Sequence, residues 1–113
     1  MKIYIAGPMS GYPEYNFPAF YKAEETFKKH GYDVVNPASL NVVPEGVTVV
    51  SGDKYWKKFM QEDINQLMTC DAIYMLHGWE KSKGASLEHH IAKELGLKVY
   101  YENDYFREDN RGT

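Results

Sequence analysis

Short apolar runs alternate along the chain with longer stretches in which apolar residues recur every three or four positions. The runs predict strands at 2–6, 32–35, 71–76 and 97–101, and the longer stretches predict helices at 17–30, 55–69 and 85–95. Strands that alternate with helices are typical of an α/β protein that has a parallel sheet with helices on both faces. We therefore expect residues 1–113 to form one domain of this class, with the tail 107–113 frayed.

The connection at 39–53 is the part of the pattern that predicts no definite element. It is rich in valine but is interrupted by Pro44, Gly46 and Gly52, which favour turns. It could hold a short hairpin, which would add a fifth strand to the sheet, or it could act as a lid over a site.

Composition and charge exclude several classes of function. The 113 residues are 43% hydrophobic, which fits a globular protein, and their net charge of −3 comes without a cluster of Lys and Arg. Nucleic acids are held mainly by grouped basic side chains, so we expect no nucleic-acid partner. No apolar run approaches the roughly 20 residues of a membrane span, and the chain starts without a signal-peptide pattern, so we expect a cytoplasmic protein with no membrane partner. The single cysteine, Cys70, is expected to be a buried core thiol.

Three loops follow predicted strands at their carboxyl ends, which is where parallel sheets bind ligands. These loops are 7–16, 36–37 and 77–84. The third leads into the helix at 85–95, whose free backbone N–H groups favour an anion. Ser82, Gly84 and Ser86 would let a phosphate or a ribose approach closely, although the same residues also suit an ordinary N-cap.

Two acidic residues are candidates for paired chemistry at the same edge of the sheet. Glu88 lies in the first turn of the predicted helix at 85–95, where an acidic side chain can also merely compensate the helix dipole. Asp63 comes just before the core-facing Ile64, about two turns before the end of its helix, which places it closer to the ligand edge. Two carboxylates that face one pocket suit glycosidic chemistry, in which one attacks or stabilises the sugar carbon and the other handles the proton of the leaving group.

His89, His90 and Trp79 are further candidates for a functional role. Neighbouring residues on a helix point about 100° apart, so His89 and His90 cannot easily share one metal ion. We therefore expect no metal site, and no motif in the chain indicates a cofactor. Trp79 lies in a polar loop, where its ring could either stack on a planar base or anchor the loop.

Three motifs in order carry a resemblance to a known family. They are Ile3-Tyr4-Ile5-Ala6-Gly7-Pro8-Met9 at the start of the chain, Asp63 followed by Asp71, and Ser82-x-Gly84-x-x-x-Glu88. With these motifs the chain resembles, up to about Tyr101, the nucleoside 2-deoxyribosyltransferase superfamily, which includes deoxyribosyltransferases and 2′-deoxynucleoside 5′-monophosphate N-glycosidases. It is most similar to a small bacterial and phage branch that begins with I-Y-I-A-G-P-M and contains G-W-E-x-S-x-G-A-x-x-E, here Gly78 to Glu88.

The resemblance implies a flavodoxin-like or Rossmann-like three-layer fold with four to five parallel strands. It also implies an enzyme that cleaves or transfers at the N-glycosidic bond of a nucleoside or nucleoside 5′-monophosphate. Glu88 matches the family's nucleophile, Asp63 the aspartate that assists departure of the base, and Tyr4 a strand tyrosine that orients the glutamate or the sugar. A helix N-terminus would help to keep Glu88 ionised. The alternative is a nucleotide-binding or sensing module on the same fold that does not cleave its ligand.

The loops and the resemblance together indicate which residues contact the substrate. The expected substrate-binding residues are Gly7, Met9, Ser10, Gly11, Asn16, Trp79, Ser82, Gly84 and Asn103. Ser82 and Gly84 match positions that hold the 5′-phosphate in the monophosphate hydrolases. Gly11 is followed by Tyr-Pro where the family has a nearby arginine, so Lys81 or Lys83 would have to replace it. The family is usually homo-oligomeric with shared sites, and Asn103 is the candidate for a residue that crosses into a neighbouring copy.

Overall fold

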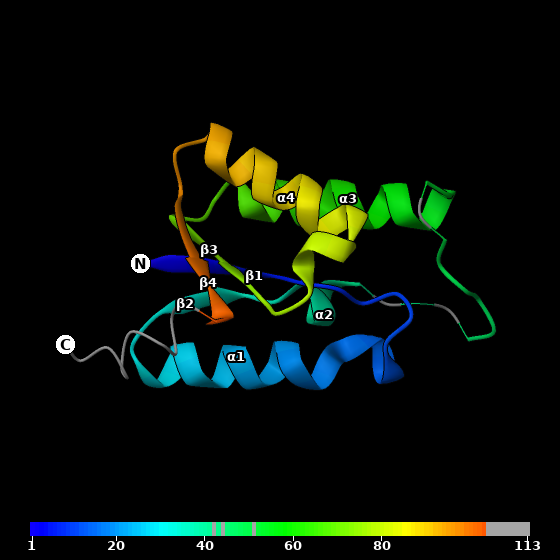
Figure 1. Ribbon diagram of the computed structural model, residues 1–113, viewed down its shortest axis with the longest axis horizontal. Coiled ribbons are helices and arrows are strands. Elements are labelled where there is room, and N and C mark those ends of the chain that lie inside the picture. Colours follow the sequence, from blue (N-terminus) through cyan, green and yellow to red (C-terminus); the bar gives the residue numbers. More distant parts are fainter. Residues whose placement is uncertain (42, 44, 51, 104–113) are drawn as a thin grey trace.

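The computed structural model describes residues 1–41, 43, 45–50 and 52–103. A parallel sheet forms its centre, with the strands in the order β2-β1-β3-β4 (Figure 1). The strands are β1 (Lys2–Ala6), β2 (Asp33–Val35), β3 (Ala72–Met75) and β4 (Lys98–Tyr101). The four predicted strands are therefore confirmed, and the described residues contain no fifth strand. The tail 107–113, predicted to fray, lies outside the described residues.

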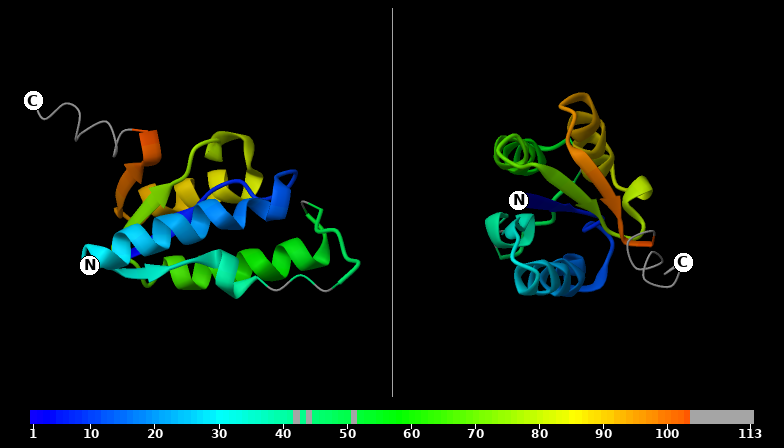
Figure 2. Two further views of the ribbon diagram at one scale, coloured as in Figure 1. Left: turned by 90° about the horizontal axis from the view of Figure 1, so that it is seen from below. Right: turned by 90° about the vertical axis from the view of Figure 1, so that its left-hand side faces the viewer.

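Helices cover both faces of the sheet (Figure 2). α1 (Phe17–Lys29) packs on one face, and α3 (Lys54–Leu67) and α4 (Lys83–Glu94) pack on the other. A short α2 (Pro37–Leu40) and two 3₁₀ turns, η1 (Pro13–Asn16) and η2 (Trp79–Lys81), complete the described elements. The strand order, which changes direction between β1 and β3, is that of flavodoxin-like folds, so the predicted fold class is confirmed. Within the described ranges, no helix is both long and apolar enough to span a membrane.

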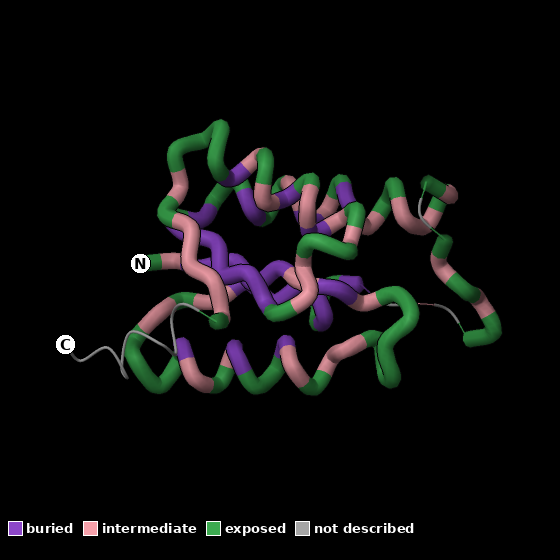
Figure 3. The backbone as a smooth tube through the Cα atoms, in the orientation of Figure 1, coloured by how far each residue is buried: buried purple, intermediate pink, exposed green. Residues whose placement is uncertain are grey.

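The central strand β1 is buried on both faces of the sheet (Figure 3). Ile3 and Ile5 belong to the core under α1, while Tyr4 and Ala6 belong to the core under α3 and α4. In the sheet, Tyr4 lies opposite Ile73 of β3. A strand with two buried faces reads as a continuous apolar run, and any polar group that it carries needs a partner inside the protein. The hydroxyl group of Tyr4 is such a group.

The structure places the start of α4 earlier than the sequence pattern predicts. Ser82 is the N-cap, because its Oγ accepts a hydrogen bond from the backbone N–H of Ala85 over 3.1 Å. The helix therefore begins at Lys83 instead of near Ala85. As a consequence, Glu88 lies in the second turn of α4 and not in the first.

The short helix α2 was not predicted from the sequence. It begins after Asn36, whose side-chain oxygen accepts a hydrogen bond from the backbone N–H of Ala38 over 2.9 Å, and it has Pro37 at its first position. Between α2 and α3 the described residues form neither a helix nor a strand, so the predicted alternative of a hairpin finds no support there. α3 begins at the N-cap Asp53, which accepts a hydrogen bond from the backbone N–H of Trp56 over 2.8 Å.

Gly7 lies where the chain leaves β1, close to the end of β3. A Cβ atom at this position would lie 2.7 Å from the Cβ of Leu76, which is closer than two such atoms can approach. Only a backbone shift could relieve this contact, so we expect Gly7→Ala to lower the free energy of unfolding by about 1–3 kcal/mol, measured by urea denaturation. Ser10→Ala, in the same loop but exposed, should change the free energy of unfolding by less than about 0.5 kcal/mol. Equal effects of the two substitutions would contradict the close packing.

Candidate active site

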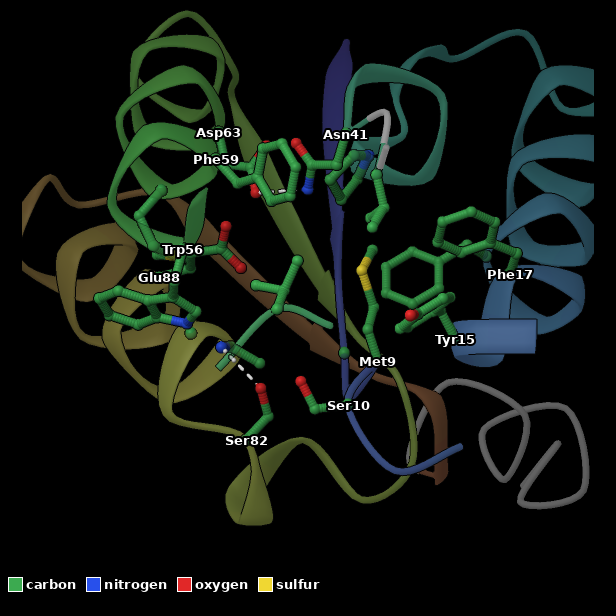
Figure 4. A pocket seen from close by; sticks show the side chains of 18 residues that line it. Met9, Ser10, Tyr15, Phe17, Asn41, Trp56, Phe59, Asp63, Ser82 and Glu88 are labelled. Atoms are coloured by element: carbon green, nitrogen blue, oxygen red, sulfur yellow. Dashed lines mark hydrogen bonds between the residues drawn. The ribbon is translucent and has the colours of Figure 1, made fainter. Parts of the chain in front are cut away.

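A pocket lies beside the carboxyl ends of β1 and β3, at the edge of the sheet where the sequence analysis expects a ligand (Figure 4). The space between its walls, together with the part open to solvent, is about 700 Å³. Its walls come from the loop after β1, the start of α1, the segment from α2 to Val49, α3, and the first turns of α4. The expected site residues that line it are Gly7, Met9, Ser10, Asp63, Ser82, Gly84 and Glu88. Segments far apart in the sequence therefore meet around one cavity.

Glu88 and Tyr4 form a buried pair on the side of this pocket toward the sheet. Tyr4 is fully buried and Glu88 is 5% exposed. The hydroxyl group of Tyr4 donates a hydrogen bond to Oε2 of Glu88, with an O···O distance of 2.5 Å. This bond orients the carboxyl group of Glu88 and favours its ionised form. Tyr4 does not itself line the pocket and acts on it through Glu88.

Asp63 enters the pocket from α3 and is held by Asn41, the residue that follows α2. Nδ2 of Asn41 donates a hydrogen bond to Oδ2 of Asp63 over 3.2 Å, and both side chains are buried. The backbone N–H of Asn41 donates to the carbonyl oxygen of Pro37 over 2.9 Å, so α2 fixes its position. Asn41 is not among the predicted site residues, because it lies in the connection at 39–53, for which the sequence predicts no definite element. The Asn36-Pro37 pair, which caps α2, was the signal that could have located it.

Burial raises the pKa values of both carboxyl groups. It raises the pKa of Asp63 to about 7, opposed by the hydrogen bond from Asn41 and aided by the nearby charge of Glu62. The pKa of Glu88 lies well above its usual value because of burial and the charge of Asp63, although the hydrogen bond from Tyr4 lowers it. Burial and the two carboxylates also raise the pKa of Tyr4. Desolvation of Glu88 thus opposes the effect expected of the helix N-terminus, which favours the ionised form.

Aromatic side chains form opposite walls of the pocket (Figure 4). Tyr15, Phe17 and Phe20 come from the segment around the start of α1, and Trp56 and Phe59 come from α3. Such side chains suit a planar aromatic ligand, because bases stack on them. Four of the five, all except Tyr15, are among the apolar residues whose spacing predicts the helices at 17–30 and 55–69. Helical spacing identifies an apolar face but does not tell a core from the wall of a pocket.

The connection at 39–53 also contributes to the pocket. Asn41, Val43 and Val49 line it, although this segment forms no regular structure after α2 in its described residues. Its described residues thus form part of the cavity wall, and the lid interpretation stays a prediction.

The N-terminus of α4 forms part of the pocket wall. Ser82 is the N-cap of α4, which is the simpler of the two interpretations given to this residue from the sequence. Its hydroxyl group accepts in the cap, so its hydrogen can still be donated to a ligand. Gly84 lets α4 approach α3 closely, since a Cβ there would lie 3.1 Å from Sδ of Met60. None of the described lining residues is Lys or Arg. Lys81 lies along a separate surface depression, and Lys83 does not line the pocket.

Four expected substrate-binding residues lie outside this pocket, namely Gly11, Asn16, Trp79 and Asn103. Nδ2 of Asn16 donates a hydrogen bond to the carbonyl oxygen of Pro8 over 2.9 Å, so this side chain supports the first loop. The ring of Trp79 packs on His89 with a centroid distance of 4.2 Å, as a loop anchor would. Nδ2 of Asn103 lies 3.4 Å from Nδ1 of His77, in the depression beside Trp79.

No metal-binding cluster of three or more His, Cys, Asp or Glu side chains occurs in the part of the chain that the structure describes. Nε2 of His89 is instead hydrogen-bonded to the hydroxyl group of Tyr101 over 2.7 Å. Cys70 is a buried free thiol, as predicted.

A family model described as "Domain of unknown function (DUF4406)" matches residues 1–101, which is most of the chain. The chain belongs to the DUF4406 family. No curated protein sequence matches this DUF4406 chain significantly.

The fold of this DUF4406 chain is similar to a solved structure of a 2-deoxyribosyltransferase from the psychrotolerant bacterium Bacillus psychrosaccharolyticus. The TM-score is 0.67 at 21% sequence identity, and the match covers 89% of this chain and 71% of the other. Similarity at this level of identity concerns the fold. It confirms the 2-deoxyribosyltransferase-like fold that the sequence motifs led us to expect.

The buried carboxyl group of Asp63 should make the stability of this DUF4406 protein depend on pH. Burial raises the pKa of Asp63 to about 7 and raises that of Glu88 as well, so the folded pair keeps protons that the unfolded chain releases above roughly pH 4. The stabilisation is therefore complete below pH 4 and is lost as the pH rises through about 7. We expect the free energy of unfolding to fall by roughly 1–4 kcal/mol between about pH 5 and 8, and the double substitution Asp63→Asn with Glu88→Gln to weaken this decline, measured by urea denaturation.

Glu25→Gln is the control for this measurement, because it removes an exposed carboxylate from α1. Its stability should follow the same dependence on pH as that of the wild type. If the double variant also retained the full decline, the ionisation of this pair would not be linked to folding.

Proposed function

We propose that this protein acts on the N-glycosidic bond of a nucleoside, either hydrolysing it or transferring the sugar to a second base. The observation that carries the proposal is that Glu88 and Asp63, from different helices, face one pocket with aromatic walls while Tyr4 holds Glu88. Two buried carboxyl groups supply a nucleophile and an acid, and the walls suit a planar base. The fold supports the same conclusion, because the similar solved structure is that of a 2-deoxyribosyltransferase described as a suitable biocatalyst for the synthesis of nucleosides.

The proposed reaction proceeds in two displacements at C1′ of the sugar. An oxygen of Glu88 attacks C1′ while the bond from C1′ to the base nitrogen breaks, and the electron pair of that bond stays with the base. Asp63, in its acid form, gives its proton to the departing base. Water or a second base then attacks C1′ and displaces Glu88, and Asp63 takes the proton that the attacking group loses. Each cycle therefore needs one proton on the two carboxyl groups.

The lining favours a nucleoside over its 5′-monophosphate. A phosphate group carries close to two negative charges and is usually paired with Arg or Lys. The described lining residues contain two acidic side chains, Asp63 and Glu88, and no basic one. Ser82 and the N-terminus of α4 would meet the uncharged 5′-hydroxyl group of a nucleoside by hydrogen bonding instead.

Glu88→Gln should abolish base release, since it removes the nucleophile while keeping the size of the side chain. We expect at least about a 10³-fold loss of kcat, because the effect of the nucleophile on the barrier is large. The assay is a mass-spectrometric screen for base release or exchange over deoxynucleosides, ribonucleosides and their monophosphates. Glu94→Gln, the same chemical change at an exposed position of α4, is the control and should keep the wild-type rate.

Base release by Glu88→Gln at the wild-type rate would remove Glu88 from the mechanism. Wild-type protein that releases no base from any member of the panel, yet binds an intact nucleoside tightly, would favour the binding module over the enzyme. Faster release from a monophosphate than from its nucleoside would contradict the substrate preference.

The rate of base release should depend on pH in a bell shape. Below about pH 7 the carboxyl pair holds two protons, so Glu88 is neutral and cannot attack. At higher pH the pair loses one proton and becomes active, and it then becomes inactive again as the second proton leaves. We expect kcat/KM to rise through about pH 7 and to fall on the alkaline side, measured on the wild type by initial rates. A value of kcat/KM that does not change with pH would contradict the roles of Glu88 as nucleophile and Asp63 as acid.

A further inference from the structure

Two buried oxygen atoms, on side chains that are hydrogen-bonded to each other, have no hydrogen-bond partner of their own. They are Oδ1 of Asn41 and Oδ1 of Asp63, and both are closed to solvent. The other polar atoms of the same side chains are joined, because Nδ2 of Asn41 donates to Oδ2 of Asp63 over 3.2 Å. The carboxamide group of Asn41 points toward Asp63 (Figure 4). A buried polar atom without a partner is unfavourable, so this pair needs an explanation.

A single proton would satisfy both oxygens. An ionised carboxylate and a carboxamide oxygen are both acceptors, so neither can donate a hydrogen bond to the other. If Oδ1 of Asp63 carries a proton, it becomes a donor, and Oδ1 of Asn41 is the acceptor without a donor. We infer that Asp63 is protonated on Oδ1 in the unliganded site and donates to Oδ1 of Asn41, so that two hydrogen bonds join the side chains. Asn41 is then the positioning residue that holds the proton for the departing base.

The charged groups around Asp63 agree with this assignment. Glu88 on α4, Tyr4 on β1 and Glu62 on α3 act on this cluster, and none of them is a cation that would favour a second carboxylate. Two interacting carboxyl groups titrate as a pair, so the hydrogen bonds decide which one keeps the last proton. Tyr4 donates to Glu88, which favours the negative charge there. Asn41 accepts from Asp63, which favours the proton there.

Asn41 would stabilise Asp63 in both of its states during the proposed reaction. In the resting site its Oδ1 accepts the proton of Asp63. When the carboxyl group turns and gives that proton to the base nitrogen, the C1′–N bond electrons remain on the base and Asp63 becomes a carboxylate. Nδ2 of Asn41 still donates to that carboxylate. The role of Asn41 in holding the proton for the departing base rests on the proposed function, whereas the protonation of Asp63 does not.

Carboxyl carbon NMR of the unliganded protein tests the assignment directly. The protein is labelled with ¹³C in its Asp and Glu carboxyl groups, and Asp63→Asn and Glu88→Gln identify the two signals. At about pH 8, where the pair keeps one proton, we expect the Asp63 carbon to show the shift of a neutral acid and the Glu88 carbon that of a carboxylate. The reverse pattern, or an ionised Asp63 together with an ionised Glu88, would overturn the inference.

Asn41→Ala tests whether Asn41 is responsible. Without the acceptor we expect the proton to move to Glu88, so the two carbon signals exchange their protonation states. Base release should then fall about 10²-fold in kcat, with a smaller change in KM, because the acid is lost and the nucleophile is neutralised. Ser39→Ala, at an exposed position of α2, is the control and should leave both signals and the rate unchanged.

The two kinds of failure can be told apart. If Asn41→Ala leaves the proton on Asp63, the role of Asn41 is wrong whatever the rate of base release. If the wild type releases no base but the NMR signals behave as expected, the proposed function fails while the protonation of Asp63 stands. Should Asn41→Ala not fold, the measurement on the wild type still decides where the proton lies.

Discussion

The hydrogen bond between Tyr4 and Glu88 is the interaction on which the candidate site depends. The parallel sheet buries β1 on both faces, so the hydroxyl group of Tyr4 needs an acceptor in the core. Glu88 is buried as well, and a carboxyl group in such a place needs a donor. Each side chain meets the requirement of the other, and the bond ties the centre of the sheet to α4. The carboxyl group of Glu88 is thus held by a deeply buried central strand of the sheet.

Much of this arrangement could be predicted from the sequence. The strands and long helices follow from the spacing of apolar residues, because burial on a sheet or on one helical face imposes a period. The edge of the sheet that carries the pocket follows from the parallel strands, whose carboxyl ends lie together. Glu88 and Asp63 could be named because they lie on elements that lead to that edge.

The rest depends on contacts that no local pattern encodes. Asn41 meets Asp63 across 22 positions of the chain, from a connection with no periodic signal. The aromatic residues Phe17 and Trp56 have the spacing of core positions, and only the packing of the helices shows that they face a cavity. The pKa shifts were also beyond reach, since desolvation depends on everything packed around Asp63 and Glu88.

The connection from α2 to α3 lines the cavity but does not help to hold Tyr4 in the sheet. Its residues Asn41, Val43 and Val49 touch the cavity, but none of them takes part in the sheet or in a long helix. A change in the length or side chains of this segment leaves the pairing of β1 with its neighbours intact, and with it the position of Tyr4. Substitutions at Val43 or Val49 therefore reshape the wall of the cavity while the bond between Tyr4 and Glu88 stays in place.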